Sequence, residues 1–249
     1  MKPLVILVLR NDQRFSSLLR GSGCEVINLE LIETVPVDDL VELKTTLAHI
    51  EDYDGLFFTS PVAAEVFIRE LKDPSWVPNG KIYILGERTK RLFENAGFDV
   101  VFRSNANTAR ELIEVFDRSE FAGNRFLFVR GDKSMRTIPE LLGCVATVDE
   151  VVVYNSVEKR PDEDTIATLK GRFRNSEIDW ICFFSPSGID SFRNYFDLGD
   201  MAHAKTAVIG DTTARRVQES GIRVDFVSQR ATATDFAGGL IQQIKNIEQ

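Results

Sequence analysis

The chain has 249 residues, 43% of them hydrophobic and 27% charged, which is the composition of a globular protein with one large or two small domains. The net charge of −8 argues against general nucleic-acid binding, because neutralising phosphates takes a basic face, and no apolar stretch is long enough for a transmembrane helix. Three scattered cysteines (Cys24, Cys144 and Cys182) predict reduced, buried thiols in a cytoplasmic protein, and two histidines are too few for a typical zinc site.

The first predicted element is an apolar strand over residues 2–10, which ends in a basic residue followed by Asn-Asp. A helix-like stretch and a second strand-like run over residues 24–32 come next. The same order returns later in the chain, with apolar runs over 125–130 and 146–154 and with Gly131-Asp132 after the first of them. We call this short strand–helix–strand order pattern A.

A longer pattern, B, follows each copy of pattern A. It opens with an apolar run that starts with an aspartate and ends in Ser-Pro, over residues 54–61 and again over 179–186. A Gly-x-x-Thr motif comes next, with another glycine eleven residues after the first. These motifs are Gly86 to Thr89 with Gly97, and Gly210 to Thr213 with Gly221. A third apolar run follows each motif (98–102 and 222–227), and then a helix opened by residues 107–108 or 234–235. Helical spacing is also present over 65–72, 89–95, 108–116, 137–142 and 165–173.

Strands and helices therefore alternate, and the strands are apolar on both faces, which predicts doubly wound parallel sheets with helices on both sides. About five strands per domain fit the flavodoxin-like order. The order A-B-A-B allows two consecutive A-B pairs, or an inner B-A pair inserted into an outer one. Residues 34–39 and 158–164, each with a proline and acidic residues, fall between patterns and favour the insertion. We expect one domain over 1–34 plus 160–249, a second over 38–156, and a two-stranded hinge near 35–38 and 156–161.

Ligands of open α/β sheets bind beyond the carboxyl ends of the strands, where helix N-termini point. Glycine, hydroxyl residues and a few basic residues occupy these positions here, and such groups suit carboxylates or phosphates; the alternative for each position alone is ordinary helix capping. On two facing domains, the set predicts a binding cleft. The candidates for substrate binding are Arg10, Thr59, Ser60, Gly86, Thr89, Arg130, Gly131, Ser185, Ser187, Lys205, Thr212 and Thr213.

No phosphate loop, nucleophile elbow or metalloprotease motif occurs in the chain. The motifs quoted above, taken together in their order and spacing, resemble the uroporphyrinogen-III synthase family over nearly the full length. The residues that carry the resemblance are 57–61 (FFTSP), 85–89 (LGERT), 153–154 (VY), 183–188 (FFSPSG) and 209–214 (IGDTTA). The resemblance implies two flavodoxin-like domains, one inserted in the other and joined by a two-stranded linker, in a monomeric protein.

The resemblance also implies a reaction without cofactor or metal. The linear tetrapyrrole hydroxymethylbilane, which carries eight carboxylates, loses its terminal hydroxyl. Ring D is then inverted through a spiro intermediate, and the macrocycle closes as uroporphyrinogen III. By the family's pattern, Tyr154 assists departure of the hydroxyl, and Thr89 and Thr213 contact the substrate. Val62 departs from the pattern, because the family often has asparagine or a basic residue there.

Two other functions fit the sequence. A two-lobed protein with a hinge also describes a sensor that binds a small anion without catalysis, and a regulatory module on a degenerate enzyme scaffold is a further alternative. If the chain is the enzyme, we expect the polycarboxylate tetrapyrrole as its small-molecule substrate and transient contact with hydroxymethylbilane synthase.

Overall fold

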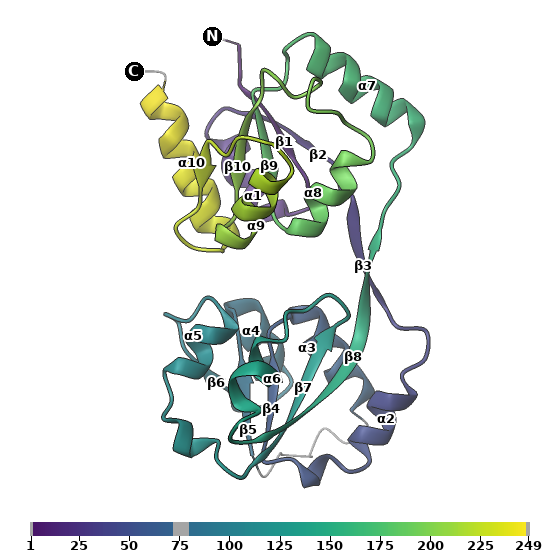
Figure 1. Ribbon diagram of the computed structural model, residues 1–249, viewed down its shortest axis with the longest axis vertical. Helices are drawn as coiled ribbons and strands as arrows, with labels where there is room; N and C mark the ends of the chain where they lie inside the picture. Colours follow the sequence, from purple (N-terminus) through teal and green to yellow (C-terminus); the bar gives the residue numbers. More distant parts are fainter. Residues whose placement is uncertain (1, 72–79, 248–249) are drawn as a thin grey trace. The chain divides into compact units, whose positions relative to one another are not determined.

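The computed structural model describes residues 2–71 and 80–247 and divides the chain into two compact units (Figure 1). We call Met1–Glu33 with Glu158–Gln249 the outer domain, and Thr34–Val157 the inserted domain. The chain passes between them where β3 (Ile32–Pro36) lies beside β8 (Thr147–Glu158). Val37 N donates to Val153 O at 3.2 Å and Lys159 N donates to Leu31 O at 2.9 Å, so the two strands run antiparallel.

The outer domain contains a sheet of five strands in the order β11-β10-β9-β1-β2. All the neighbouring strands are parallel. The strands are β1 (Val5–Val8), β2 (Glu25–Asn28), β9 (Trp180–Phe183), β10 (Lys205–Val208) and β11 (Phe226–Val227). Every residue of β1 and β9 is buried, as expected for central parallel strands with helices on both faces.

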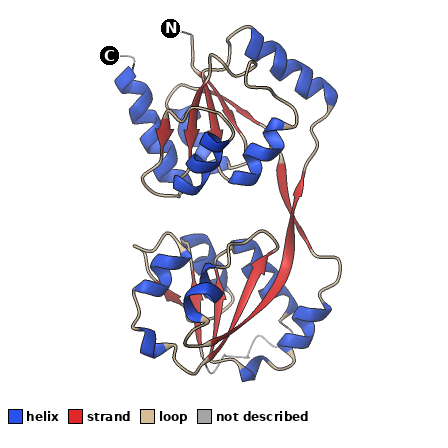
Figure 2. Ribbon diagram, in the orientation of Figure 1, coloured by secondary structure: helices blue, strands red, loops and turns tan. Residues whose placement is uncertain are grey.

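Successive residues of β1 serve the two faces of this sheet. Ile6 packs in the cluster that includes Phe15 of α1 (Gln13–Gly21) and Phe236 of α10 (Ala233–Ile247). Leu7 packs in the opposite cluster, with side chains from three other helices. These are α7 (Glu163–Arg174), α8 (Pro186–Arg193) and α9 (Asp211–Glu219). Helices on both faces of the sheet of the outer domain are visible in Figure 2.

The inserted domain contains a sheet in the order β3-β8-β7-β4-β5-β6. Its remaining strands are β4 (Gly55–Phe58), β5 (Lys81–Ile84), β6 (Val101–Phe102) and β7 (Arg125–Gly131). One face packs on α2 (Val41–Leu47), α3 (Pro61–Glu70) and α4 (Glu87–Asn95), and the other on α5 (Ala109–Glu114) and α6 (Thr137–Leu142). The described part of this domain also contains two single-turn 3₁₀ helices, η1 (Ile50–Asp52) and η2 (Arg118–Glu120).

The two sheets have the same spatial order but different chain orders. The outer sheet reads β2-β1-β9-β10-β11 across, and the inserted sheet, apart from its edge strand β3, reads β8-β7-β4-β5-β6. Both are the flavodoxin-like order, if β7-β8 are taken as the counterparts of β1-β2. The inserted domain is thus a circular permutation of the outer one. The predicted fold class, with one doubly wound domain inserted in the other, is confirmed.

The aspartate that opens each copy of pattern B has a structural role. Asp54 Oδ2 accepts a hydrogen bond from Arg125 N at 2.8 Å, and Asp179 Oδ2 accepts one from Val5 N at 2.7 Å. Each carboxylate therefore ties the start of a pattern B strand to the start of the neighbouring pattern A strand, at the amino edge of the sheet.

Some local predictions were wrong. Cys182 is buried, but Cys144 is exposed on the loop after α6, so the thiols are not all buried. Helix α10 begins at Ala233, after Thr232, whose hydroxyl accepts from Asp235 N at 3.1 Å, and not at residues 234–235. The last residue predicted for the helix over 65–72 lies outside the described residues. Within residues 2–71 and 80–247, no helix has the length and apolar character needed to cross a membrane.

Candidate functional site

At the carboxyl edge of the inserted sheet, two helices begin directly after strands. Ser60 is the N-cap of α3 and its hydroxyl accepts from Val62 N at 3.2 Å. Gly86 is the N-cap of α4, with φ of 84°, a left-handed conformation that favours glycine. No side chain caps α4, and residues 86–88 are exposed. The first amide groups of α4 are thus free to donate to a ligand.

The carboxyl edge of the outer sheet repeats this arrangement. Ser185 is the N-cap of α8, accepts from Gly188 N at 3.1 Å, and lies 3.1 Å from the hydroxyl of Ser187. Gly210 is the N-cap of α9, again without a side-chain cap, and Thr212 in its first turn is exposed. Arg10, beyond the end of β1, is exposed, with its guanidinium carbon 5.6 Å from the centroid of the Phe184 ring.

These groups share one chemistry, which is donation of hydrogen bonds to anions. The N-terminus of a helix carries a partial positive charge and unpaired N–H groups, so it stabilises a carboxylate or phosphate. Both uncapped helices, α4 and α9, have nine residues. Each domain thus presents an uncapped helix N-terminus and a Ser-Pro loop at the carboxyl edge of its own sheet, as the repeated motifs predict.

Tyr154 lies at the carboxyl edge of the inserted sheet, where β8 is irregular. Arg130 pairs with Val152 but Gly131 pairs with Tyr154, so Val153 is an extra residue on β8. Such a bulge redirects the next side chain. As a result Val151, Val153 and Tyr154 all belong to the same core cluster, although strict alternation would turn Tyr154 to the other face. Tyr154 is 9% exposed, and its hydroxyl makes no hydrogen bond to another described residue.

Comparison with known proteins identifies the family to which the chain belongs. The sequence profile described as uroporphyrinogen-III synthase HemD matches residues 13–237. The chain belongs to the uroporphyrinogen-III synthase family.

Relatives and solved structures agree with this assignment. The uroporphyrinogen-III synthase of Chlorobaculum parvum is 28% identical over 200 residues, covering 78% of this chain and 80% of the relative. The enzyme of Schizosaccharomyces pombe is 27% identical, covering 80% of each chain. In structure, the synthetase of Helicobacter pylori aligns over 96% of this chain and 99% of its own with a TM-score of 0.65. A mutant synthase of Thermus thermophilus aligns over 98% and 99% with a TM-score of 0.61. At 16% and 13% identity, these two structures support the fold alone.

The protein is accordingly a cyclising lyase of tetrapyrrole biosynthesis. Membership of this synthase family does not favour the alternative of an anion sensor without catalysis.

One predicted site residue of the outer domain does not lie with the other candidates of that domain. Lys205 is the first residue of β10 and is paired with Trp180, the first residue of β9. It therefore lies at the amino edge of the outer sheet, whereas Ser185, Gly210 and Arg10 follow the carboxyl ends of their strands. The prediction that Lys205 belongs to the same rim was wrong, because the loop before a parallel strand lies at the opposite edge from the loop after it.

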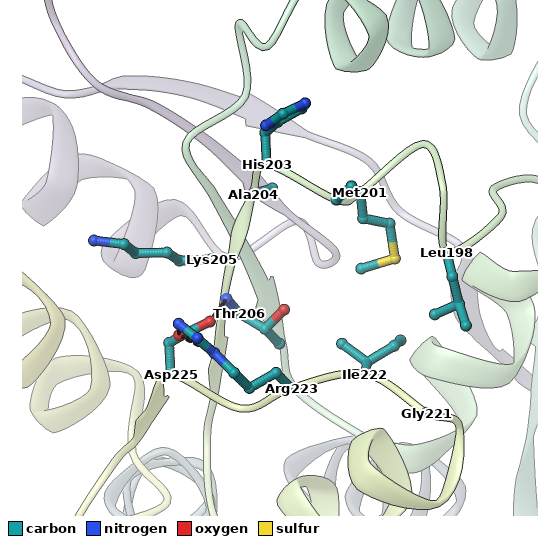
Figure 3. A pocket seen from close by; sticks show the side chains of 11 residues that line it. Leu198, Met201, His203, Ala204, Lys205, Thr206, Gly221, Ile222, Arg223 and Asp225 are labelled. Atoms are coloured by element: carbon teal, nitrogen blue, oxygen red, sulfur yellow. Dashed lines mark hydrogen bonds and ion pairs between the residues drawn. The ribbon is translucent and has the colours of Figure 1, made fainter.

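Lys205 instead lines an open cavity of about 390 Å³ at that amino edge (Figure 3). Thr206 N donates to Asp225 Oδ2 at 2.9 Å, and Arg223 forms an ion pair with the same carboxylate. Leu198, Met201 and Ile222 form the apolar part of the lining. The cavity is therefore separate from the groups that gather at the carboxyl edge of this sheet.

Arg130 of the synthase is engaged within its own domain. Its Nε lies 2.7 Å from Glu150 Oε2, and its side chain is 15% exposed. Its Nη1 donates to Gly131 O at 2.8 Å and to Asp132 O at 3.1 Å. Glu150 also pairs with Arg136 at 2.6 Å. The guanidinium thus holds the loop after β7, and its charge is already balanced by a carboxylate.

The two threonines of the Gly-x-x-Thr motifs are buried, Thr89 at 1% and Thr213 at 4% exposure. In the described residues Thr89 Oγ1 has no hydrogen-bond partner, although it is inaccessible to solvent. The second and third residues of each motif are exposed and the threonine is not, so a ligand meets the start of the helix first and the threonine hydroxyl lies behind it. Thr59 is half-buried at the end of the strand before α3.

Two residues that fix the loop after β7 were not among the candidates from the sequence. Ser134 Oγ accepts from Gly131 N at 3.1 Å, and Asp132 Oδ1 accepts from Ser156 N at 2.8 Å. The only signal is a Gly-Asp followed by a hydroxyl residue after an apolar strand, which is common in loops. Among residues 2–71 and 80–247, no group of three His, Cys, Asp or Glu is arranged to hold a metal ion.

Proposed function

We propose that this chain converts hydroxymethylbilane into uroporphyrinogen III and that Tyr154 assists the departure of the terminal hydroxyl. The observation that carries the proposal is the setting of Tyr154. Tyr154 is 9% exposed at the carboxyl edge of the inserted sheet, and its hydroxyl has no hydrogen-bond partner in the described residues. A tyrosine held in this way keeps its phenolic proton available for a substrate oxygen.

The chemistry needs such a donor. Hydroxide is a poor leaving group, and a hydrogen bond or proton from a positioned side chain lowers the barrier to its departure. The nitrogen of the adjacent pyrrole supplies the electron pair that expels the hydroxyl, which leaves a cationic azafulvene. The phenol of Tyr154 transfers its proton to the departing oxygen, which leaves as water, and the resulting tyrosinate takes up the proton that ring D releases when the macrocycle closes.

The choice of isomer is a matter of position. The cation must be attacked by the substituted carbon of ring D, which gives the spiro intermediate and then the inverted ring. Attack by the free carbon of ring D would give the symmetric isomer I. Closure of the macrocycle also proceeds unassisted. The protein's main contribution is therefore to hold the two ends of the linear tetrapyrrole in one geometry.

The carboxylates of the substrate supply the means of holding it. We assign them to the uncapped N-termini of α4 and α9, which begin after Gly86 and Gly210, and to the Ser-Pro loops at Ser60 and Ser185. Arg10 adds a cation that is exposed and has no carboxylate within 4.0 Å in the described residues. Local donors of this kind hold a polyacid even on a chain with a net charge of −8.

The test is to supply Tyr154→Phe with hydroxymethylbilane and to separate isomers I and III. We expect the rate of isomer III formation to fall and the fraction of isomer I to rise. A loss of roughly 10²-fold or more indicates proton donation, and a loss of roughly 3–10-fold indicates a single hydrogen bond. Tyr83→Phe, which changes a buried tyrosine of β5 in the same sheet, is the matched control and should retain the rate. Unchanged isomer III formation by Tyr154→Phe would remove Tyr154 from the mechanism.

A further inference from the structure

We propose that Gly131 is a positioning residue, which sets the place of the Tyr154 hydroxyl by leaving room for its ring. The proposal rests on the function proposed for Tyr154 and adds a second residue to it. Gly131 ends β7, is buried, and is the residue paired with Tyr154 across the bulge.

The first observation is the close approach of the ring to the backbone of Gly131. A Cβ atom at position 131 would lie 2.3 Å from Cζ, 2.4 Å from Cε2 and 2.7 Å from the hydroxyl oxygen of Tyr154. All three atoms belong to the hydroxyl end of the ring. Side-chain atoms do not approach to such distances, so the present position of the phenol requires glycine at 131.

The second observation is that the backbone around this contact is fixed from both strands. Gly131 N donates to Ser134 Oγ at 3.1 Å, and Asp132 N donates to Tyr154 O at 3.0 Å. Ser156 N donates to Asp132 Oδ1 at 2.8 Å. The residues on either side of the contact are therefore held together, and a methyl group at 131 is accommodated mainly by movement of the ring.

The size of that movement follows from the distances. An ordinary contact begins at about 3.4 Å, so the ring must withdraw by about 1 Å from the 2.3 Å that a Cβ would otherwise impose. A displacement of about 1 Å costs on the order of 10²-fold in rate when a catalytic group depends on its position. The bulge turns Tyr154 toward this face, and Gly131 leaves the space into which it turns.

The experiment is a double-mutant cycle between Gly131→Ala and Tyr154→Phe, with kcat for isomer III as the readout. In the Tyr154 background, we expect Gly131→Ala to lower kcat by roughly 10–10²-fold. In the Tyr154→Phe background, no hydroxyl remains to be misplaced, so the same substitution should change kcat by less than about 2-fold. A purely structural role for Gly131 would lower kcat equally in both backgrounds, and that result would overturn the proposal.

Gly55→Ala is the control for strain in the same sheet. A Cβ at Gly55 would lie 2.9 Å from Lys81 O and 2.9 Å from Phe126 Cε1, at the amino edge and away from Tyr154. We expect this variant to lose stability and to keep the kcat of the folded protein. A fall in its kcat comparable with that of Gly131→Ala would also overturn the proposal.

A second variant serves if Gly131→Ala does not fold. Ser134→Ala removes the acceptor of Gly131 N without adding volume, and it should lower kcat by roughly 3–10-fold in the Tyr154 background alone, as expected for one lost hydrogen bond. An equal loss with and without the Tyr154 hydroxyl would refute the positioning role.

If Tyr154→Phe alone leaves isomer III formation unchanged, the proposed function of Tyr154 fails. If Tyr154→Phe lowers isomer III formation but the effect of Gly131→Ala on kcat is the same in both backgrounds, only the proposal for Gly131 fails.

Discussion

Replacement of Thr89 by valine should stabilise the protein and weaken its action on the substrate. The two side chains have nearly the same shape, and only the hydroxyl is lost. Thr89 is 1% exposed and its Oγ1 has no hydrogen-bond partner in the described residues. A buried hydroxyl without a hydrogen-bond partner lowers the free energy of unfolding by about 1–3 kcal/mol, and the valine methyl group carries no such penalty. Helix propensities of threonine and valine are similar, so helix α4 itself contributes little to the difference.

We therefore expect Thr89→Val to raise the free energy of unfolding by about 1–2 kcal/mol, measured by urea titration, and to raise Tm by roughly 3–8 °C. Thr212→Val is the matched control, because Thr212 is exposed in the first turn of α9, and it should change stability by less than about 0.5 kcal/mol. In the complex we expect the Thr89 hydroxyl to donate to a carboxylate of the bound substrate. Its loss should then lower kcat/KM by roughly 10–10²-fold.

The two halves of this prediction fail in different ways. Destabilisation of Thr89→Val by 1 kcal/mol or more would mean that the hydroxyl has a partner in the free protein, which refutes the argument from burial. Stabilisation with unchanged kcat/KM would mean that the Thr89 hydroxyl makes no hydrogen bond to the bound substrate. The substrate contact at α4 would then be limited to backbone amides.

Three more results are expected. Lys205→Ala should leave KM for hydroxymethylbilane within about 2-fold of the wild type in steady-state assays, because Lys205 is at the amino edge of its sheet; a large rise in KM would return it to the site. Asp179→Ala should lower the free energy of unfolding by about 1.5–3 kcal/mol in urea titration, because it removes the charged acceptor of Val5 N; an unchanged midpoint would contradict this. Burial raises the pKa of Tyr53 and of Tyr83 to about 12, with the hydrogen bond to Asp149 adding to the effect at Tyr53. The folded state keeps these protons while the unfolded state loses them near pH 10, so the free energy of unfolding should fall as pH rises from about 10 toward 12; Tyr53→Phe should flatten that decline, and an unaltered pH profile would argue against it.

The sequence predicts the repeats well because each depends on short-range chemistry. The Gly-x-x-Thr motifs begin helices α4 and α9, and the glycines at 97 and 221 both have positive φ after the helix, where a left-handed residue ends it. The order A-B-A-B left the pairing of the halves open, and the two proline-bearing segments indicated the inserted arrangement. These are signals that neighbouring residues carry by themselves.

What the sequence does not reveal depends on partners distant in the chain. Lys205 is the first residue of β10, and the edge of the sheet at which it lies is set by the parallel pairing of β10 with β9. The bulge at Val153 exists only in relation to β7, and the turn of Tyr154 toward Gly131 follows from it. The burial of Thr89 is likewise set by the packing of α4 on the sheet. Each is a property of two elements together.

The interleaved chain order has a consequence for synthesis on the ribosome. β1 needs β9 as its neighbour, and the bond from Val5 N to Asp179 spans 174 residues, which take roughly 10–35 s to translate. The inserted domain is continuous and is finished first, while the nascent β1 waits with one edge unpaired. Until β7 has been made, one edge of β4 is unpaired. In the inserted sheet β7 has the place that β1 has in the outer sheet, so β1 can pair with β4 by mistake before β9 has been synthesised.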